Sequence, residues 1–127
     1  MDEEMEFVIR LAKRAGDIVF RVFGGEFEVV QKADDQGPVT VADRKADELI
    51  CEELERAFPR DGILSEEAPD DLSRLHHERL WLVDPLDGTR QFVEGIAAFA
   101  VMIGLAESGC PTMGVVHLPA EGLTYAG

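Results

Sequence analysis

Two carboxylates lie three residues apart at the end of an apolar run, in the segment WLVDPLDGTR that spans residues 81–90. An Asp-Pro turn followed by an Asp helix cap would explain Asp84 and Asp87 one at a time. Together they suit another chemistry, because Pro85 restricts the turn so that both carboxylates can face one side. One such carboxylate can bridge two cations ~3.5–4 Å apart, as in two-metal phosphoryl sites. The segment is therefore a candidate metal site.

Two more acids, Glu66 and Glu67, follow the short apolar segment GILS, just as Asp84 follows WLV. Strand ends hold side-chain directions better than loops do, so we expect these acids to converge on one point. Oxygen ligands without a nearby His or Cys are typical of a hard cation such as Mg²⁺, with Mn²⁺ as a substitute. An EF-hand loop and the D-x-D-G-T motif of haloacid dehalogenase phosphatases are both excluded by the spacing of the acids.

Four other residues are candidates for reaction chemistry. Gly88 lets the backbone turn closely, and Thr89 opens a predicted short helix whose amides can hold a phosphate oxygen. Thr40 and Asp43 flank the predicted start of a longer helix, where helix capping is one interpretation. The functional interpretation is that Asp43 reaches Thr89 and that the two polarise a metal-bound water.

The elements that must position these residues are two helices followed by strands. Helical periodicity predicts helices over residues 5–23 and from about Thr40 to Phe58, where Pro59 ends the second. The stretch 32–38 reads as a polar loop. Short apolar or alternating runs predict strands at residues 27–31, 62–65, 80–83, 99–105, 113–118 and 123–126. Two helices and then a largely antiparallel sheet indicate an α+β fold. The chain stops as a strand begins, so we expect an unfinished sheet.

The charge of the chain limits its partners. Twenty-six acids against 12 Lys and Arg give a net charge of −14 among 127 residues. Nucleic acids and anionic membranes need a basic surface, so we expect neither as a partner. The acidic N-terminus does not resemble a signal peptide, and the apolar run 96–106 is shorter than the ~20 residues that span a bilayer. We therefore expect a cytoplasmic protein.

The cysteines and histidines read as structural or surface residues. Cys51 and Cys110 are too few for a disulfide framework, and Cys51 in a helical pattern is typical of a buried thiol. His76 and His77 lie in a polar segment and are interpreted as surface residues. His117, inside a predicted strand, is interpreted as a structural histidine.

Four segments, KADDQGPVTVAD, ILSEEA, WLVDPLDGT and GVVHLP, occur in this order and together resemble the inositol monophosphatase family of Mg²⁺-dependent, lithium-sensitive phosphomonoesterases. The resemblance covers essentially the whole chain and implies the N-terminal part of a layered sugar-phosphatase fold. It implies that Glu66, Asp84 and Asp87 bind metal, together with the carbonyl of Leu86. It further implies that Asp43 and Thr89 activate the attacking water, and that the amides of Gly88 and Thr89 hold the phosphate. Lys32 lies where the family often has a Lys near the site.

The implied reaction is an in-line displacement of an alcohol from a phosphate monoester by water, without a covalent enzyme intermediate. The substrate is then a small phosphorylated metabolite. Ser-Glu-Glu and the basic Arg90 after Gly-Thr are more similar to the 3′(2′),5′-bisphosphate nucleotidases, which hydrolyse adenosine 3′,5′-bisphosphate, although Gln91 departs from their pattern. Inositol-1-monophosphatase and histidinol-phosphatase activities are the alternatives.

One expected motif is absent from the sequence. The second half of family members carries a further metal-binding Asp in a W-D-x-x-A-type motif, whereas the single Trp here, Trp81, is followed by Leu82. We therefore interpret residues 1–127 as an N-terminal metal-binding domain without its C-terminal domain. The alternative from a different class is a catalytically incomplete acidic fragment that acts as a homodimer or a partner subunit, because exposed strand edges pair.

Overall fold

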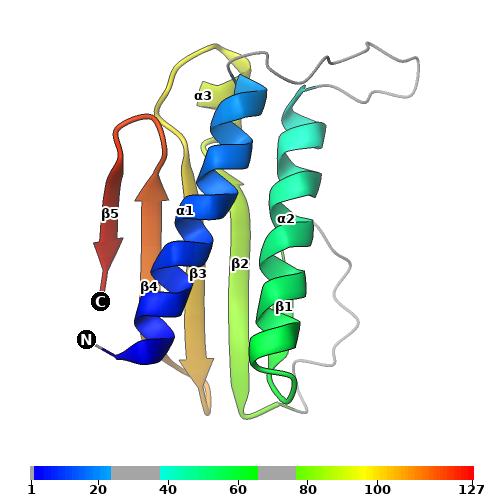
Figure 1. The fold of residues 1–127 in the computed structure, drawn as a ribbon, viewed down its shortest axis with the longest axis vertical. Helices are drawn as coiled ribbons and strands as arrows, with labels where there is room; N and C mark the ends of the chain where they lie inside the picture. The colour runs from blue at the N-terminus through cyan, green and yellow to red at the C-terminus, as the bar shows by residue number, and fades with distance from the viewer. Residues whose placement is uncertain (1, 24–37, 66–76) are drawn as a thin grey trace.

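The computed structural model describes residues 2–23, 38–65 and 77–127, and it contains two long helices and one five-stranded sheet (Figure 1). The strand predicted at 27–31 lies outside these residues. The helices are α1 (Glu3–Phe23), α2 (Pro38–Ala57) and the short α3 (Thr89–Val93). The strands are β1 (Gly62–Ser65), β2 (Arg79–Asp87), β3 (Ala100–Glu107), β4 (Cys110–Leu118) and β5 (Leu123–Ala126).

The sheet has the order β1-β2-β3-β4-β5, in which β1 pairs with β2 in parallel and the other neighbours are antiparallel. The expectation of an α+β fold with a largely antiparallel sheet is therefore confirmed. The β3–β4 hairpin turns on Ser108 and Gly109, whose φ values of 50° and 82° suit the two-residue turns that match strand twist. The fourth strand therefore begins at Cys110, three residues before the strand predicted at 113–118.

The first helix forms where the apolar residues recur with helical spacing. Residues Val8, Leu11, Ala15 and Val19 are buried on one side of α1. The Asp2 carboxylate accepts a hydrogen bond of 3.0 Å from the amide of Glu4, and acids fill the first turn, so the helix start is capped and matched to its dipole.

The second helix begins at Pro38, earlier than the start predicted near Thr40. Proline is favoured in a first helical turn because its missing amide has no partner there. Thr40 and Asp43 therefore lie inside the helix, and the capping interpretation of this pair is wrong. Ala46, Ile50 and Leu54 form its buried stripe.

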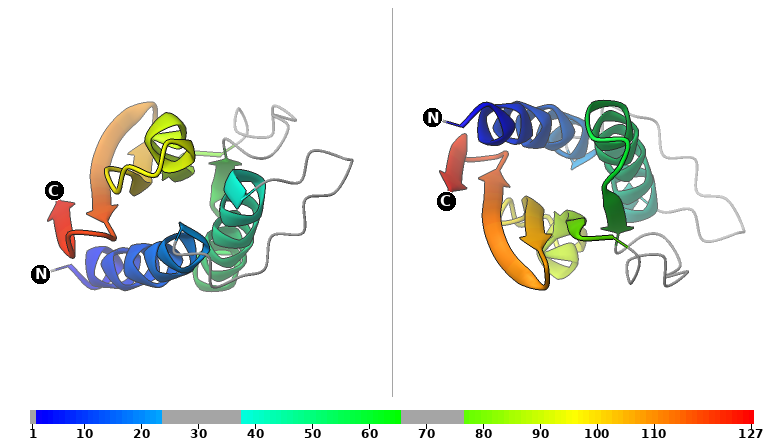
Figure 2. Two further views of the ribbon diagram at one scale, coloured as in Figure 1. Left: turned by 90° about the horizontal axis from the view of Figure 1, so that it is seen from above. Right: turned by 90° about the horizontal axis from the view of Figure 1, so that it is seen from below.

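Both long helices lie on the same side of the curved sheet (Figure 2), where α1 packs against β3 and β4 and α2 against β1 and β2. We call this side the covered face. Its strand residues are buried and include Trp81, Val83, Val101, Ile103, Leu105 and Val115. Neither long helix covers the opposite side, which we call the open face and which carries Leu64, Leu82, Met102, Gly104, Gly114 and Val116.

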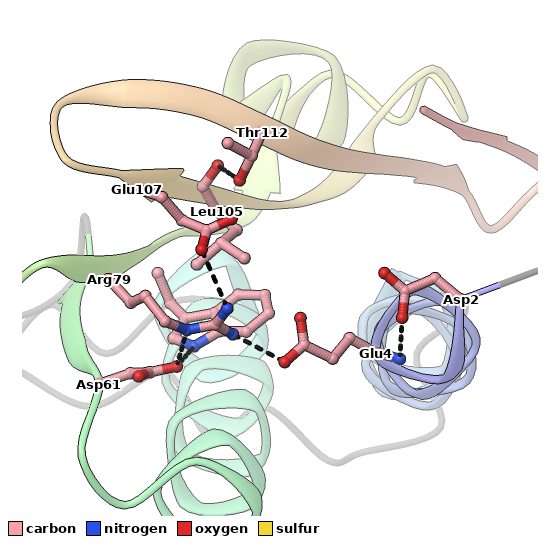
Figure 3. A network of polar contacts seen from close by, with 8 residues as sticks. Asp2, Glu4, Asp61, Arg79, Leu105, Glu107 and Thr112 are labelled. Atoms are coloured by element: carbon pink, nitrogen blue, oxygen red, sulfur yellow. Dashed lines mark hydrogen bonds and ion pairs between the residues drawn. The ribbon is translucent and has the colours of Figure 1, made fainter.

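A polar cluster lies at the end of the covered face where β2 begins, which we call the lower end (Figure 3). The guanidinium of Arg79 contacts carboxylate oxygens of Asp61 at 3.0 Å, Glu4 at 2.9 Å and Glu107 at 3.3 Å. It lies 5.9 Å from the ring centroid of Trp81, whose indole N–H donates to Asp61 at 2.9 Å. The cluster joins α1, the α2–β1 turn, β2 and β3. It lies at the opposite end of β2 from Asp84 and Asp87.

Candidate functional site

The D-P-L-D segment lies inside β2, where the sequence predicts a strand ending at Val83 and a turn. Asp84 pairs with Met102 and Asp87 with Ala100, so two residues of β2 stand opposite Val101 alone. This is a β-bulge, and Pro85 is compatible with it because proline cannot donate to a regular ladder. The turn prediction is therefore wrong, since the motif is an irregular part of the strand.

The bulge places both acids of the motif on one side of the sheet. Met102 and Ala100 are two residues apart on β3 and so share a face, and their partners Asp84 and Asp87 share it too. In a regular strand, residues three apart face opposite sides. The geometry that the sequence assigns to a turn is thus produced by one extra residue in a strand.

Gly88 follows directly and links β2 to α3. Its φ of 93° is left-handed, and a Cβ at this position would lie 3.1 Å from the carbonyl oxygen of Ala98 and 3.2 Å from Cα of Phe99. Only glycine meets both requirements without strain. The Gly88 carbonyl oxygen accepts a hydrogen bond of 3.0 Å from the amide of Phe92. The ring centroid of Phe92 lies 5.4 Å from that of Phe99 and 5.5 Å from that of Phe23. The start of α3 is therefore held firmly beside the motif.

The C-terminal end of α1, the N-terminal end of α2, the end of β2 and α3 all lie at one end of the molecule, which we call the upper end (Figure 1). Asp43 is half-buried in the second turn of α2, and this helix contacts both β2 and α3. The structure thus brings the helix of Asp43 to the end where β2 delivers Asp84 and Asp87.

Several predicted site residues lie outside the described part of the chain. These are Lys32, Glu66 and Glu67, together with the side chain of Thr89, whose backbone begins α3. β1 runs parallel to β2, and its last residue, Ser65, lies beside Val83, four residues before β2 ends at Asp87. Within residues 2–23, 38–65 and 77–127, no three His, Cys, Asp or Glu side chains lie close enough to hold a metal ion. The described acids are the oxygen donors that a hard cation prefers, but they are not a complete ligand set.

Asp47 is a feature that sequence reasoning missed. It lies one helical turn after Asp43, and its carboxylate accepts hydrogen bonds from the hydroxyl of Ser65 and, at 3.5 Å, from the thiol of Cys51. Cys51 is half-buried, and burial and the negative charge of Asp47 raise the pKa of its thiol to about 12, so the thiol stays protonated near neutral pH. The available signal was the spacing of Asp43, Asp47 and Cys51 at every fourth residue.

A cavity of about 530 Å³ lies on the open face. Its side-chain lining is mostly apolar and comes from Leu64, Leu82, Met102 and Val116, with Asp84 at one border. A phosphate ester needs charged or polar donors, which most of this lining lacks. The centre of the cavity is therefore poorly suited to a phosphate ester, and Asp84 is the charged residue of its lining.

The histidine interpretations agree with the described structure. His117 is buried on the covered face, and its ring lies 2.8 Å from the Thr124 hydroxyl. Burial, together with the charge of Lys13, lowers the pKa of His117. His77 is exposed, while His76 lies outside the described residues.

A profile of the inositol monophosphatase family matches residues 1–127. The chain belongs to the inositol monophosphatase family. It is 43% identical over 124 residues to the 3′(2′),5′-bisphosphate nucleotidase CysQ of Salmonella typhimurium, covering 95% of this chain and 50% of that protein. It is 39% identical over 126 residues to a histidinol-phosphatase of Chlorobaculum parvum, covering 98% of this chain and 48% of that protein.

Solved structures of family members share the fold. An IMPase of Thermotoga maritima superposes with a TM-score of 0.82 at 31% identity, over 99% of this chain and 48% of that chain. CysQ of Bacteroides thetaiotaomicron gives a TM-score of 0.79 at 34% identity, over 92% and 42%. The chain spans about half the length of the curated relatives that it matches. In the described part of the chain, no helix is long and apolar enough to cross a membrane.

Proposed function

We propose that this chain supplies the metal-binding and water-activating part of a phosphoric monoester hydrolase. The observation that carries the proposal is the bulge in β2, which puts Asp84 and Asp87 on one side of the sheet immediately before Gly88. Membership of the inositol monophosphatase family supports it independently. In this proposal residues 1–127 form an N-terminal metal-binding domain, which corresponds to about half the length of the curated relatives.

The proposed ligands of Mg²⁺, or of Mn²⁺ in its place, are the carboxylates of Glu66, Asp84 and Asp87 and the carbonyl of Leu86. When bound, the metal lowers the pKa of water and neutralises charge on the phosphate oxygens. Asp43 accepts the proton of the attacking water, which Thr89 orients.

The phosphate is proposed to accept hydrogen bonds from the first amides of α3. The amides of Gly88 and Thr89 precede the first intrahelical bond and therefore point out of the helix end. Lys32 and Glu67 complete the proposed site as a nearby cation and a second acid. The family resemblance supports the place of Lys32, and the position of Glu67 directly after Glu66 supports that of Glu67.

The proposed substrate is adenosine 3′,5′-bisphosphate, a small phosphorylated metabolite. The Ser-Glu-Glu sequence and Arg90 after Gly-Thr support this substrate, and relatives named bisphosphate nucleotidase agree with it. Histidinol phosphate and inositol 1-phosphate are the alternative substrates, supported by relatives named for those activities.

Metal binding and phosphate release test the proposal together. Titration of the chain with Mg²⁺ by calorimetry should show saturable binding that Asp84→Asn weakens at least ~10-fold, because it removes a charged ligand. Glu121→Gln is the matched control, since it removes one exposed acid far along the chain from the motif. Equal binding by Asp84→Asn and Glu121→Gln would refute the metal site.

Phosphate release from the three candidate esters, with and without lithium, then ranks the substrates. We expect the fastest release from adenosine 3′,5′-bisphosphate and inhibition by lithium. Faster release from histidinol phosphate or inositol 1-phosphate would overturn the substrate assignment while leaving the hydrolase proposal standing.

A second candidate is a non-catalytic acidic domain that associates as a homodimer or as a partner subunit. The exposed apolar side chains of Leu82, Leu123 and Tyr125 favour this alternative. Light scattering at several concentrations tests it. A strict monomer that also binds Mg²⁺ tightly would count against this alternative.

A further inference from the structure

Asp47 joins α2 to the end of β1 through a hydrogen bond between two side chains. The hydroxyl of Ser65 donates to the Asp47 carboxylate, and Ser65 is 5% exposed while Asp47 is half-buried. A hydrogen bond to an ionised acceptor is stronger than one between neutral groups and also more directional. The bond therefore fixes where α2 stands relative to this strand end.

The two ends of this bond lie next to proposed site residues. Asp43 precedes Asp47 by four residues, so both project from the same face of α2, about 6 Å apart along its axis. Ser65 pairs with Val83, the residue directly before Asp84. The bond thus connects the helix of Asp43 with the end of β1, beside the part of β2 that leads directly into Asp84.

Other roles for Asp47 fit less well. It lies in the helix interior, so it caps no helix end, and it belongs to no cluster of three potential metal ligands among the described residues. Apolar side chains at these two positions would bury area without the desolvation of a carboxylate. A polar pair is favoured where one relative placement of two elements must be selected over others.

We propose that Asp47 is a positioning residue that holds α2 in one register against the end of β1, so that Asp43 keeps a fixed place relative to Asp84. The inference rests on the proposed function, because it assigns Asp43 and Asp84 to one reacting site. Asp47 itself touches neither metal nor substrate in this assignment.

The first test measures Mn²⁺ affinity by electron paramagnetic resonance in Asp47→Ala, Ser65→Ala and the double variant. Each single variant should weaken binding ~10-fold, the size typical of residues that orient ligands. The double variant should be no weaker than the single variants, because both remove the same interaction. Ser65→Thr retains the hydroxyl and should restore affinity to within about twofold of the unchanged protein.

Glu53→Ala is the matched control. Glu53 also ties α2 to a neighbour, through an ion pair of 3.1 Å with Arg14 of α1, but it does not reach β1. Its removal should leave Mn²⁺ affinity unchanged within about twofold, even where it lowers the melting temperature. A loss of affinity in Glu53→Ala equal to that in Asp47→Ala would reduce the effect to general stability and overturn the inference.

Hydrogen exchange provides a readout that needs no metal. In Ser65→Ala, which removes only a hydroxyl and is the milder variant, amides in the N-terminal half of α2 should exchange faster than those near Glu53. Absence of Mn²⁺ binding by the unchanged protein would refute the proposed function. Normal binding by the unchanged protein, with unaltered affinity and exchange in both Asp47→Ala and Ser65→Ala, would refute the positioning role alone.

Discussion

The two faces of the sheet differ in how much of their apolar surface the chain itself covers. On the covered face, Trp81 and Val101 are completely buried under α1 and α2. On the open face, Leu82 is 40% exposed, although it lies between Trp81 and Val83 in the same strand. Burial of apolar area is the main source of folding free energy, so most of the stability should come from the covered face.

The two acids of β2 in the proposed site belong to the other side. The register of β2 places Asp84 and Asp87 with Met102 on the open face, whereas the acids at the lower end of the covered face are paired with Arg79. Most of the stability thus depends on the covered face, whereas the proposed site combines open-face acids of β2 with Asp43 of α2 at the upper end. Substitutions of neighbouring residues in the same strand should therefore have very different consequences.

The largest difference is expected between Ile103→Ala and Met102→Ala. Ile103 is 1% exposed on the covered face, so its truncation should lower the free energy of unfolding by about 2–5 kcal/mol. Met102 is half-exposed on the open face, so its truncation should lower the free energy of unfolding by less than about 1.5 kcal/mol. Urea denaturation followed by circular dichroism measures both. Similar losses in the two variants would mean that the open face is as well packed as the covered one.

The next largest difference in stability is expected between two substitutions in the polar cluster around Arg79. Asp61→Ala removes the acceptor of the buried Trp81 indole N–H and a contact of Arg79, so we expect a loss of about 2–4 kcal/mol. Glu4→Ala breaks a more exposed pair with the same arginine and should cost about 1 kcal/mol or less. Thermal unfolding of the two variants makes the comparison. A larger loss in Glu4→Ala would contradict the view that burial of the partner sets the cost.

Alanine substitutions at two glycines test how much space is available on each face of the sheet. A Cβ on Gly16 of α1 would lie 2.7 Å from Cδ2 of the His117 ring, so Gly16→Ala should destabilise by about 1–3 kcal/mol. A Cβ on Gly114 meets no atom within 4 Å, so Gly114→Ala should be neutral or stabilise by up to about 1 kcal/mol. Chemical denaturation tests the pair. A clear destabilisation by Gly114→Ala would show that the open face is filled in solution, for example by a second copy.

The smallest expected effect is a pH dependence from the covered face. Because burial lowers the pKa of His117, the unfolded chain takes up the proton more readily than the folded one. The contribution of His117 is therefore fully present above about pH 6.5, the ordinary pKa of histidine, and is lost as the pH falls toward the lower folded value. Between pH 7 and pH 5, the unchanged protein should lose more stability than His117→Gln. Parallel curves for the two proteins would contradict this assignment.

Local patterns predict much of this fold. The helix over residues 5–23 and the hairpin strands follow from periodicity and turn residues that lie close in the sequence. The path of residues 84–87 does not, because Asp, Pro and Gly are typical of turns and only the register with β3 reveals a bulge. The bond between Asp47 and Ser65 is also unpredictable, since it joins residues 18 apart that meet only after α2 packs on the sheet.

The sequence is sufficient to predict which residue types form the candidate site, but it does not predict how they are arranged in space. The sequence identifies Asp43, Asp84 and Asp87 as candidates because their chemistry suits hard cations, and the structure brings their elements to one end of the molecule. Their roles stay predictions, as do those of Lys32, Glu66 and Glu67, which lie outside the described residues. Side-chain convergence depends on packing between elements distant in sequence.

The bulge in β2 also shifts the alternation of side chains along the strand by one residue. Before the bulge, odd-numbered residues such as Trp81 and Val83 point to the helices, and even-numbered residues point away. After it, the odd-numbered Asp87 lies on the same side as the even-numbered Asp84. The spacing of acids in a sequence is therefore not a direct measure of which side they face. Two chains with acids two apart in a regular strand, or three apart across a bulge, present them alike, and an alignment gap of one residue can preserve a site that it seems to disrupt.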